Sequence, residues 1–295
     1  MREAGAIAKS MLLEAAVLQW KVSPFECEVK KSMVFHPPSS RSKSFGDLSY
    51  HASKLKIPKK VKLKDPKNYT LLGKDRLRTD SFMKVNGTAP FSMDINIYGM
   101  VYAMVEKPSP FGAKYISSNL NEVKKQSGII DVFPISRGVA IVGKNTWAVI
   151  QARKILKVKW EGKSPVNNDS NLYLAHMKEL KDEKAKSVRK EGNPKTILKA
   201  NNNLHEVEYH MPFQTHAAME PLNCVVDVQD NYCEIWVGTQ NAKNAIDRAH
   251  EITGIDKKNI KLNITFLGGG FGRKSFNDWI DEGLLISQKI KKPTK

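Results

Sequence analysis

The sequence predicts an α+β protein of more than one module. Short apolar segments alternate with short amphipathic ones over residues 87–160, and the same alternation returns after residue 205. A polar stretch broken by glycine and proline, 161–203, separates these two regions. The length of 295 residues corresponds to about two domains of roughly 150 residues. No apolar run approaches the roughly 18 residues that a membrane-spanning helix needs, so no such span is expected.

The first 86 residues are expected to form an N-terminal helical segment followed by a basic connector. Residues 2–20 have the apolar periodicity of one amphipathic helix, although no capping residue precedes it. A second short helix is predicted at 44–54, because Ser44 and Asp47 have the spacing of a capping box. The lysine- and proline-rich sequence from there to about residue 84 indicates an extended surface connector.

The central region, 87–160, is expected to be a compact α+β module. Gly128 should end its first helix, and Thr146 should cap its second. The predicted strands are 100–105, 129–135, 138–142 and 157–160, and the predicted helices are 119–127 and 146–156. The polar stretch that follows contains one expected helix, 172–186.

The sequence after residue 205 predicts a second α/β region. Gly254 stands where a left-handed residue ends a helix, and Asp278 opens another helix. The predicted strands are 205–213, 222–228, 232–237 and 260–267, and the predicted helices are 242–253 and one that runs from 278 into Lys291.

Charge and cysteine content narrow the class of partner. The net charge is +18, and residues 21–86 hold 16 Lys or Arg against 6 Asp or Glu. Lysine outnumbers arginine and few aromatic residues lie between the cations, so a solvated basic surface or a face for an acidic partner is favoured over a nucleic-acid site. Cys27, Cys224 and Cys233 lack CxxC or CxxxxC spacing, so this chain is expected to ligate neither structural zinc nor an iron–sulfur cluster.

A glycine-rich segment links the last predicted strand to the last helix. Residues 268–272, here called the glycine loop, contain four glycines and precede Arg273 and Lys274. Backbone N–H groups in such a loop favour anionic oxygens, and the two cations should strengthen that binding. Walker A spacing fails because Arg273 stands between Gly272 and Lys274, and the GxGxxG pattern fails as well. The alternative is a turn where strand and helix pack closely.

Two other polar segments also follow predicted strands. In 216–223, His216 and Glu220 stand beside a proline, and the alternative is a satisfied histidine with a surface glutamate. In 238–241, Gln240 could donate to an oxo or carbonyl oxygen, and the alternative is a helix N-cap at Thr239 or Asn241. Loops at strand ends gather ligands in α/β sheets, so we expect the three segments to lie together.

These three segments, in this order, resemble the molybdopterin-binding subunit of the xanthine dehydrogenase/aldehyde oxidase family, of the isoquinoline 1-oxidoreductase β-subunit type. The resemblance extends to Arg2–Ala6, Leu63–Pro66 and Pro110–Gly112. It implies a remnant of the cofactor-binding region with the connector over 1–86, an α/β-hammerhead module over 87–160, a polar connector over 161–204, and the start of the molybdopterin-binding region over 205–295.

The resemblance also implies roles for individual residues. Gln240 would hydrogen-bond an oxo ligand of molybdenum, and Gly269–Arg273 would contact the metal and its pterin, with the backbone of Gly270, Phe271 and Gly272 packed against them. His216 and Glu220 would shape the substrate pocket. Ser275 stands where xanthine-oxidising members carry a glutamate, so an aldehyde or N-heterocycle is expected rather than a purine.

The implied cofactor is a molybdopterin dinucleotide in its cytosine form, with a [2Fe-2S] cluster on a small partner subunit. The family's catalytic base is a glutamate that would lie beyond Lys295, so no catalytic residue is assigned, and the sequence is interpreted as an inactive fragment when alone. The alternative is a non-catalytic assembly module with a basic face for an acidic partner. The sequence does not decide between periplasm and cytoplasm.

Overall fold

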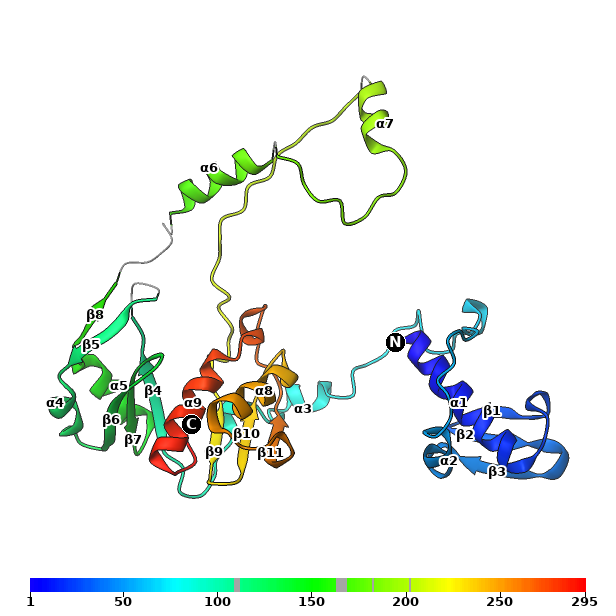
Figure 1. Ribbon diagram of the computed structural model, residues 1–295, viewed down its shortest axis with the longest axis horizontal. Coiled ribbons are helices and arrows are strands. Elements are labelled where there is room, and N and C mark those ends of the chain that lie inside the picture. Colours follow the sequence, from blue (N-terminus) through cyan, green and yellow to red (C-terminus); the bar gives the residue numbers. More distant parts are fainter. Residues whose placement is uncertain (109–111, 163–168, 182, 202) are drawn as a thin grey trace. The chain divides into compact units, whose positions relative to one another are not determined.

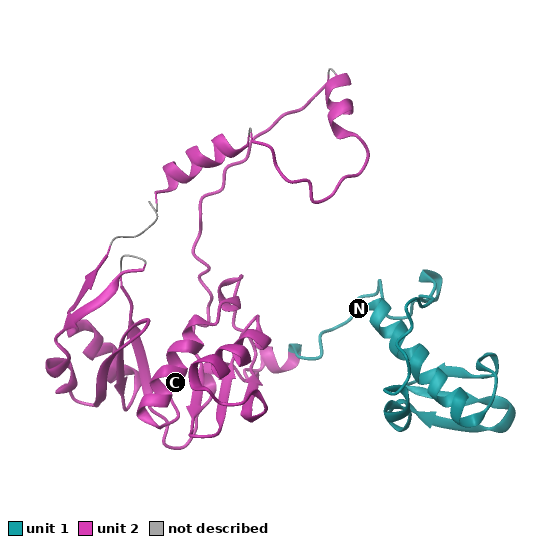
Figure 2. Ribbon diagram, in the orientation of Figure 1, with its two compact units in different colours: residues 1–81 teal, residues 82–295 magenta. Residues whose placement is uncertain are grey.

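The computed structural model describes the chain except for residues 109–111, 163–168, 182 and 202. The chain divides into two compact units, Met1–Ser81 and Phe82–Lys295 (Figure 2). Among the described helices, none combines the length and the apolar character that crossing a membrane would require.

Unit 1 combines two helices with a small antiparallel sheet. The predicted helices are confirmed as α1 (Arg2–Trp20) and α2 (Phe45–Ala52), and Ser44 with Asp47 forms the expected capping box. The sheet, in the order β1 (Glu28–Lys30), β2 (Met33–His36), β3 (Arg41–Ser44), was not predicted. Its strands are three or four residues long, too short for a period-2 pattern to be recognised. The core of the unit joins Ala16 of α1, Val34 of β2 and Leu48 of α2.

The remainder of the first 95 residues is largely irregular. Between α2 and residue 80 the regular structure is limited to η3 (Pro66–Asn68), in agreement with the predicted extended connector. The other short helices of this part are η1 (Pro24–Glu26), η2 (Pro37–Ser39), α3 (Ser81–Val85) and η4 (Ser92–Asp94).

The first half of unit 2 is an α+β module, as expected, and its strands form two sheets (Figure 1). One sheet has the order β4 (Tyr102–Glu106), β7 (Gly138–Gly143), β6 (Ile129–Ile135); the other pairs β5 (Lys114–Ser118), which was not predicted, with β8 (Val158–Glu161). Two helices, α4 (Leu120–Lys124) and α5 (Thr146–Ile155), contribute side chains to the apolar core of this module. Thr146 was predicted to cap α5, but Asn145 does so: its Oδ1 accepts from the N–H of Ala148 at 2.9 Å.

The polar stretch and the segment after it differ from their predictions. The predicted helix ends earlier, as α6 (Ser170–Leu180), and α7 (Pro194–Ala200) was not predicted. The predicted strand 205–213 is wrong, because these residues have no regular structure. Their apolar residues alternate as in a half-buried strand, yet no described strand pairs with them and Met211 is 90% exposed.

The second half of unit 2 is a three-stranded sheet covered by two helices (Figure 1). Its strands are β9 (Val225–Val228), β10 (Cys233–Val237) and β11 (Ile260–Ile264), with β10 in the centre, parallel to β11 and antiparallel to β9. The helices are α8 (Ala242–Thr253) and α9 (Asp278–Ile290). The short helix η5 (Lys257–Asn259) lies between α8 and β11, and η6 (Arg273–Ser275) lies between β11 and α9. Gly254 ends α8 at φ 75°, as predicted.

Helix α9 joins the two halves of unit 2. Its Ile286 packs in one apolar cluster with Phe133 of β6 and Val142 of β7. The carboxylate of Asp281 on α9, 2% exposed, pairs with Arg137 of the central module and with Arg248 of α8. One buried carboxylate therefore connects α9 with α8 and with the turn between β6 and β7.

Replacing Asp281 tests how much these ion pairs contribute to stability. Asp281→Asn removes the buried partner of two arginines, so we expect the free energy of unfolding to fall by about 2 kcal/mol. Urea unfolding followed by circular dichroism measures the loss. Asp230→Asn, which breaks the exposed pair with Lys291, is the control and should change stability by less than about 0.5 kcal/mol. Equal effects of the two substitutions would contradict the assignment.

Candidate functional site

The three polar segments singled out from the sequence lie together in unit 2. Because β10 and β11 are parallel, the segments that follow them leave the same edge of the sheet. The N–H of Gln240 donates to the carbonyl of Lys274 at 3.0 Å, and the N–H of Glu220 donates to the carbonyl of Gly268 at 2.9 Å. Backbone hydrogen bonds thus connect both 238–241 and 216–223 to the glycine loop and the residues after it.

Two positions of the glycine loop have no room for a side chain. A Cβ at Gly268 would lie 2.4 Å from Cβ of Glu220, and one at Gly270 would lie 2.6 Å from Oε1 of Gln240. Gly269 and Gly272 have φ values of 93° and 94°, which other residues rarely adopt. The glycines are therefore required by the close approach of the neighbouring segments and by the turn itself.

The loop presents three consecutive N–H groups. The N–H of Gly268 donates to Glu220 Oε2 at 3.1 Å, and that of Gly272 donates to Gln240 Oε1 at 3.0 Å. Within the described part of the chain, the N–H groups of residues 269–271 have no hydrogen-bond acceptor. Adjacent N–H groups of this kind form a concave site for anionic atoms.

Gln240 is held in one orientation by the loop. Because its Oε1 accepts from the N–H of Gly272, the amide nitrogen Nε2 is identified as the other end of the side chain. Gln240 is exposed, and Nε2 has no acceptor among the described residues. The carboxamide therefore offers a hydrogen-bond donor beside the three free N–H groups.

The cations after the loop are engaged within the chain, which does not agree with their predicted role as anion ligands. Arg273 donates from both Nη atoms to the carboxylate of Asp278, at 2.6 and 2.7 Å. Burial raises the pKa of the Asp278 carboxyl, but the hydrogen bonds from Arg273 outweigh this and hold the pKa below its usual range. Lys274 is 1% exposed, and its Nζ lies 2.7 Å from Glu220 Oε2. Of the predicted anion ligands, the backbone N–H groups of the loop are therefore the ones that are not engaged with Asp278 or Glu220.

Glu220 and His216 occupy different environments. Glu220 is buried beneath the loop, where burial raises its pKa but hydrogen bonds, led by the one from Lys274, outweigh this and hold the pKa below its usual range. It supports the loop instead of facing a pocket. His216 is exposed, and no described contact joins its imidazole to the loop. Ala218 of the same segment would meet a Cβ at Gly269 at 3.5 Å, so the segment itself lies against the loop.

The capping alternative for 238–241 also holds. Asn241 is the N-cap of α8, since its Oδ1 accepts from the N–H of Asn244 at 3.3 Å. Thr239 donates to Asn277 Oδ1 at 2.6 Å, and its own Oγ1 accepts from the N–H of Asn241. Helix capping and a free Gln240 amide are thus compatible in one turn.

Sequence reasoning missed two buried residues that hold these segments. Asn277 is fully buried, at φ 57°, and donates to the carbonyl of Asn241 at 2.9 Å. Ser92 is 1% exposed, and its Oγ accepts from the N–H of Gly238 at 2.8 Å. No local pattern marks Ser92, because it lies 146 positions from its partner.

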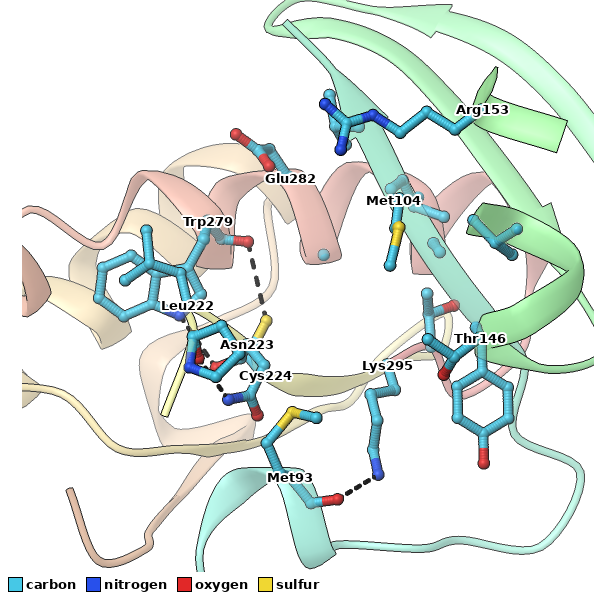
Figure 3. A pocket seen from close by; sticks show the side chains of 18 of the residues that line it. Met93, Met104, Thr146, Arg153, Leu222, Asn223, Cys224, Trp279, Glu282 and Lys295 are labelled. Atoms are coloured by element: carbon cyan, nitrogen blue, oxygen red, sulfur yellow. Dashed lines mark hydrogen bonds between the residues drawn. The ribbon is translucent and has the colours of Figure 1, made fainter. Parts of the chain in front are cut away.

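A cavity of about 360 Å³ lies beside the site, between β4, α5 and α9 (Figure 3). Its wall is mainly apolar, with Met104, Leu222 and Trp279 among the side chains. Burial raises the pKa of its Glu282 carboxyl above the usual range, although Lys107 Nζ lies 2.6 Å away. None of the sequence-predicted site residues lines this cavity.

Comparisons with known proteins identify the region that contains the three segments. Residues 177–295 match the model of the molybdopterin cofactor-binding domain. The chain is 28% identical to the beta subunit of isoquinoline 1-oxidoreductase from Brevundimonas diminuta, over 97% of this chain and 42% of that protein. It is 24% identical to a nicotinate dehydrogenase subunit from Pseudomonas putida, over 100% of this chain and 25% of that protein.

Solved structures agree in fold. Quinoline 2-oxidoreductase from Pseudomonas putida 86 superposes with a TM-score of 0.54 at 15% identity, over 75% of this chain and 34% of that one. The aldehyde oxidoreductase from Desulfovibrio gigas gives a TM-score of 0.56 at 13% identity, over 74% of this chain and 29% of that one.

Residues 177–295 thus match the molybdopterin cofactor-binding domain, and almost the whole chain is similar to the beta subunit of isoquinoline 1-oxidoreductase. The resemblance found in the sequence and the predicted α+β class are confirmed. The chain spans about two fifths of the length of the first curated relatives that it matches.

The loop geometry fits a pterin cofactor. Molybdopterin is anionic, and the loop offers the N–H groups of residues 269–271, which have no acceptor within the described part of the chain. Gln240 Nε2 supplies a further donor at the same place. The fit rests on the main chain and one amide, because the nearby cations are already paired.

Alanine at the two crowded glycines should have different consequences. At Gly268 the obstacle is Cβ of Glu220, which moves only with its backbone, so Gly268→Ala should lower stability by about 1–3 kcal/mol. At Gly270 the obstacle is the end of the flexible Gln240 side chain, so Gly270→Ala should cost less than about 1 kcal/mol while displacing Gln240. Urea unfolding compares the two, with Gly5→Ala as control: this open position lies in helix α1, so alanine there should not lower stability. A larger loss for Gly270→Ala would refute this interpretation of the loop.

The ion pair beneath the loop predicts a pH dependence. The folded pKa of Glu220 lies below its unfolded value, so its stabilising contribution is present at neutral pH and is lost as pH falls through the folded pKa. The stability difference between wild type and Glu220→Gln should therefore shrink as the pH falls below the ordinary glutamate pKa of about 4.3. Urea unfolding at a series of pH values measures it. A difference that stays constant over this range would show that Glu220 does not act through its charge.

Proposed function

We propose that the chain supplies part of the molybdopterin dinucleotide site of a molybdenum hydroxylase-type oxidoreductase. The observation that carries the proposal is the Gln240 amide, held by the Gly272 N–H so that Nε2 is free beside the three N–H groups of residues 269–271. This arrangement lies inside the region that matches the molybdopterin cofactor-binding domain. The whole enzyme would oxidise an aldehyde or N-heterocycle with oxygen derived from water.

The chain's own residues would bind and orient the cofactor. When bound, the molybdenum–pterin group supplies the redox chemistry. The N–H groups of residues 269–271 would donate to its anionic atoms. Gln240 would donate from Nε2 to an oxygen ligand of the metal. Arg273 would contribute through its main chain, because its guanidinium is paired with Asp278.

The proposed substrate class follows from the family and from Ser275. The similar proteins are named for isoquinoline, nicotinate and aldehyde substrates. By the resemblance described above, Ser275 would stand where purine-oxidising members carry a glutamate, which favours an aldehyde or N-heterocycle over a purine. His216, exposed on the segment that adjoins the loop, would contact the substrate side of the site.

The cofactor form and the partner are further proposals. We expect the cytosine dinucleotide and a separate [2Fe-2S] subunit that accepts the electrons. Similar proteins are named as subunits of their enzymes, which supports a multi-subunit assembly. The family match favours this oxidoreductase role over a purely structural assembly module with a basic face.

The carboxylates around the loop, those of Glu220, Asp278 and Glu282, are engaged in ion pairs, so none of these three is a free general base. Glu220 is paired with Lys274, Asp278 with Arg273, and Glu282 with Lys107. Because a general base typically contributes about 10²–10⁴-fold to such a step, cofactor binding and turnover should separate in this 295-residue chain.

The chain produced in cells that synthesise the cofactor should therefore retain molybdenum and pterin yet show no aldehyde turnover. Elemental analysis and pterin fluorescence measure retention, and dye reduction measures turnover. Gly270→Ala should lose most of the metal, because its Cβ would lie 2.6 Å from Gln240 Oε1 and displace that side chain, while Gly5→Ala should retain it. Absence of both metal and pterin from the folded wild-type chain would contradict the proposed function.

A further inference from the structure

We infer that Ser92, Glu220 and Lys274 form a buried positioning cluster that sets the Gln240 amide against the glycine loop. The inference rests on the proposed function of that loop. The three residues come from segments far apart in the sequence, and each is at most 8% exposed. None of them is a free donor or acceptor for a ligand, so their effect on the cofactor would pass through the residues that they hold.

The centre of the positioning cluster is the Lys274–Glu220 ion pair. Nζ of Lys274 lies 2.7 Å from Oε2 of Glu220, and the two side chains are 2% and 6% exposed. Removing two charges from water is costly, and a pair this deeply buried is favourable only when its geometry and its further hydrogen bonds are good. The pair therefore constrains every group that bonds to it.

Glu220 holds the first residue of the loop at two points. Its Oε2 accepts from the N–H of Gly268 at 3.1 Å, and its own N–H donates to the carbonyl of Gly268 at 2.9 Å. Its Oε1 accepts from the N–H of Ser92 at 3.1 Å. The main chain of Gly268, at the start of the loop, is thus fixed to both the carboxylate and the backbone of Glu220.

The other two members of the positioning cluster hold the strand end that carries Gln240. Oγ of Ser92 accepts from the N–H of Gly238 at 2.8 Å, and the carbonyl of Lys274 accepts from the N–H of Gln240 at 3.0 Å. Residues on both sides of Thr239 are therefore bonded to the same cluster as Gly268. The Gly272–Gln240 hydrogen bond forms between two segments whose separation the positioning cluster determines.

A double variant separates positioning from stability. Lys274→Met combined with Glu220→Gln removes both charges and leaves no unpaired buried charge, so the chain should fold with a thermal midpoint close to wild type. Hydrogen exchange of the Gly272 N–H, measured by NMR on the chain without cofactor, should nevertheless become about tenfold faster. The dissociation constant for the molybdopterin dinucleotide should rise by about tenfold as well.

Two further variants complete the test. Asp281→Asn breaks the ion pairs that the buried Asp281 carboxylate makes with Arg137 and Arg248, and it should lower the thermal midpoint while leaving Gly272 exchange within about twofold of wild type. Ser92→Ala removes the Oγ acceptor of Gly238 and should accelerate Gly272 exchange by about threefold; it keeps the inference testable if the double variant does not fold.

The inference is overturned if a folded double variant, or Ser92→Ala, exchanges Gly272 at the wild-type rate. It is also overturned if Asp281→Asn accelerates that exchange as much as the double variant does. Failure of the wild-type chain to bind the dinucleotide would instead refute the proposed function, while the exchange rates of the cofactor-free chain would still decide the role of the positioning cluster.

Discussion

An ammonium group and a carboxylate, those of Lys274 and Glu220, meet 2.7 Å apart beneath the glycine loop with side chains only 2% and 6% exposed. Because neither charge is hydrated, each has to find its partners within the protein. The carboxylate finds them in two main-chain N–H groups as well as in the lysine. The segments that contain Ser92, Glu220 and the glycine loop are far apart in the sequence, and these contacts bring them together and fix the distances between them.

This pairing changes which groups remain for a ligand. A glycine loop followed by Arg-Lys suggests a cationic anion site, yet the arginine and the lysine are both neutralised within the chain. What remains is uncharged: N–H groups at residues 269–271 and the amide of Gln240. A site of this kind recognises the shape and the acceptor positions of a bound group more than its net charge, which suits a cofactor that must be oriented as well as held.

The sequence predicted the elements that carry strong local signals. Helix α8 was predicted with its correct bounds, because its apolar face is periodic and Gly254 marks its end. The strand predicted at 205–213 shows the converse, since alternation describes a strand only where a neighbouring strand exists. Partners of charged side chains could not be predicted either: the lysine at 274 is visible in the sequence, but the glutamate that it meets is 54 positions away. Ser92, at 128 positions from Glu220, carries no signal at all.

The most direct test of the account follows the backbone amides while the cofactor binds. In NMR spectra of the ¹⁵N-labelled chain, addition of the molybdopterin dinucleotide should shift the N–H resonances of residues 269–271 and the Nε2 resonances of Gln240, and leave those of residues 54–67 in place. Shifts confined to the lysine-rich residues 54–67, with the glycine loop unchanged, would show that the dinucleotide binds through surface charge and would contradict the account.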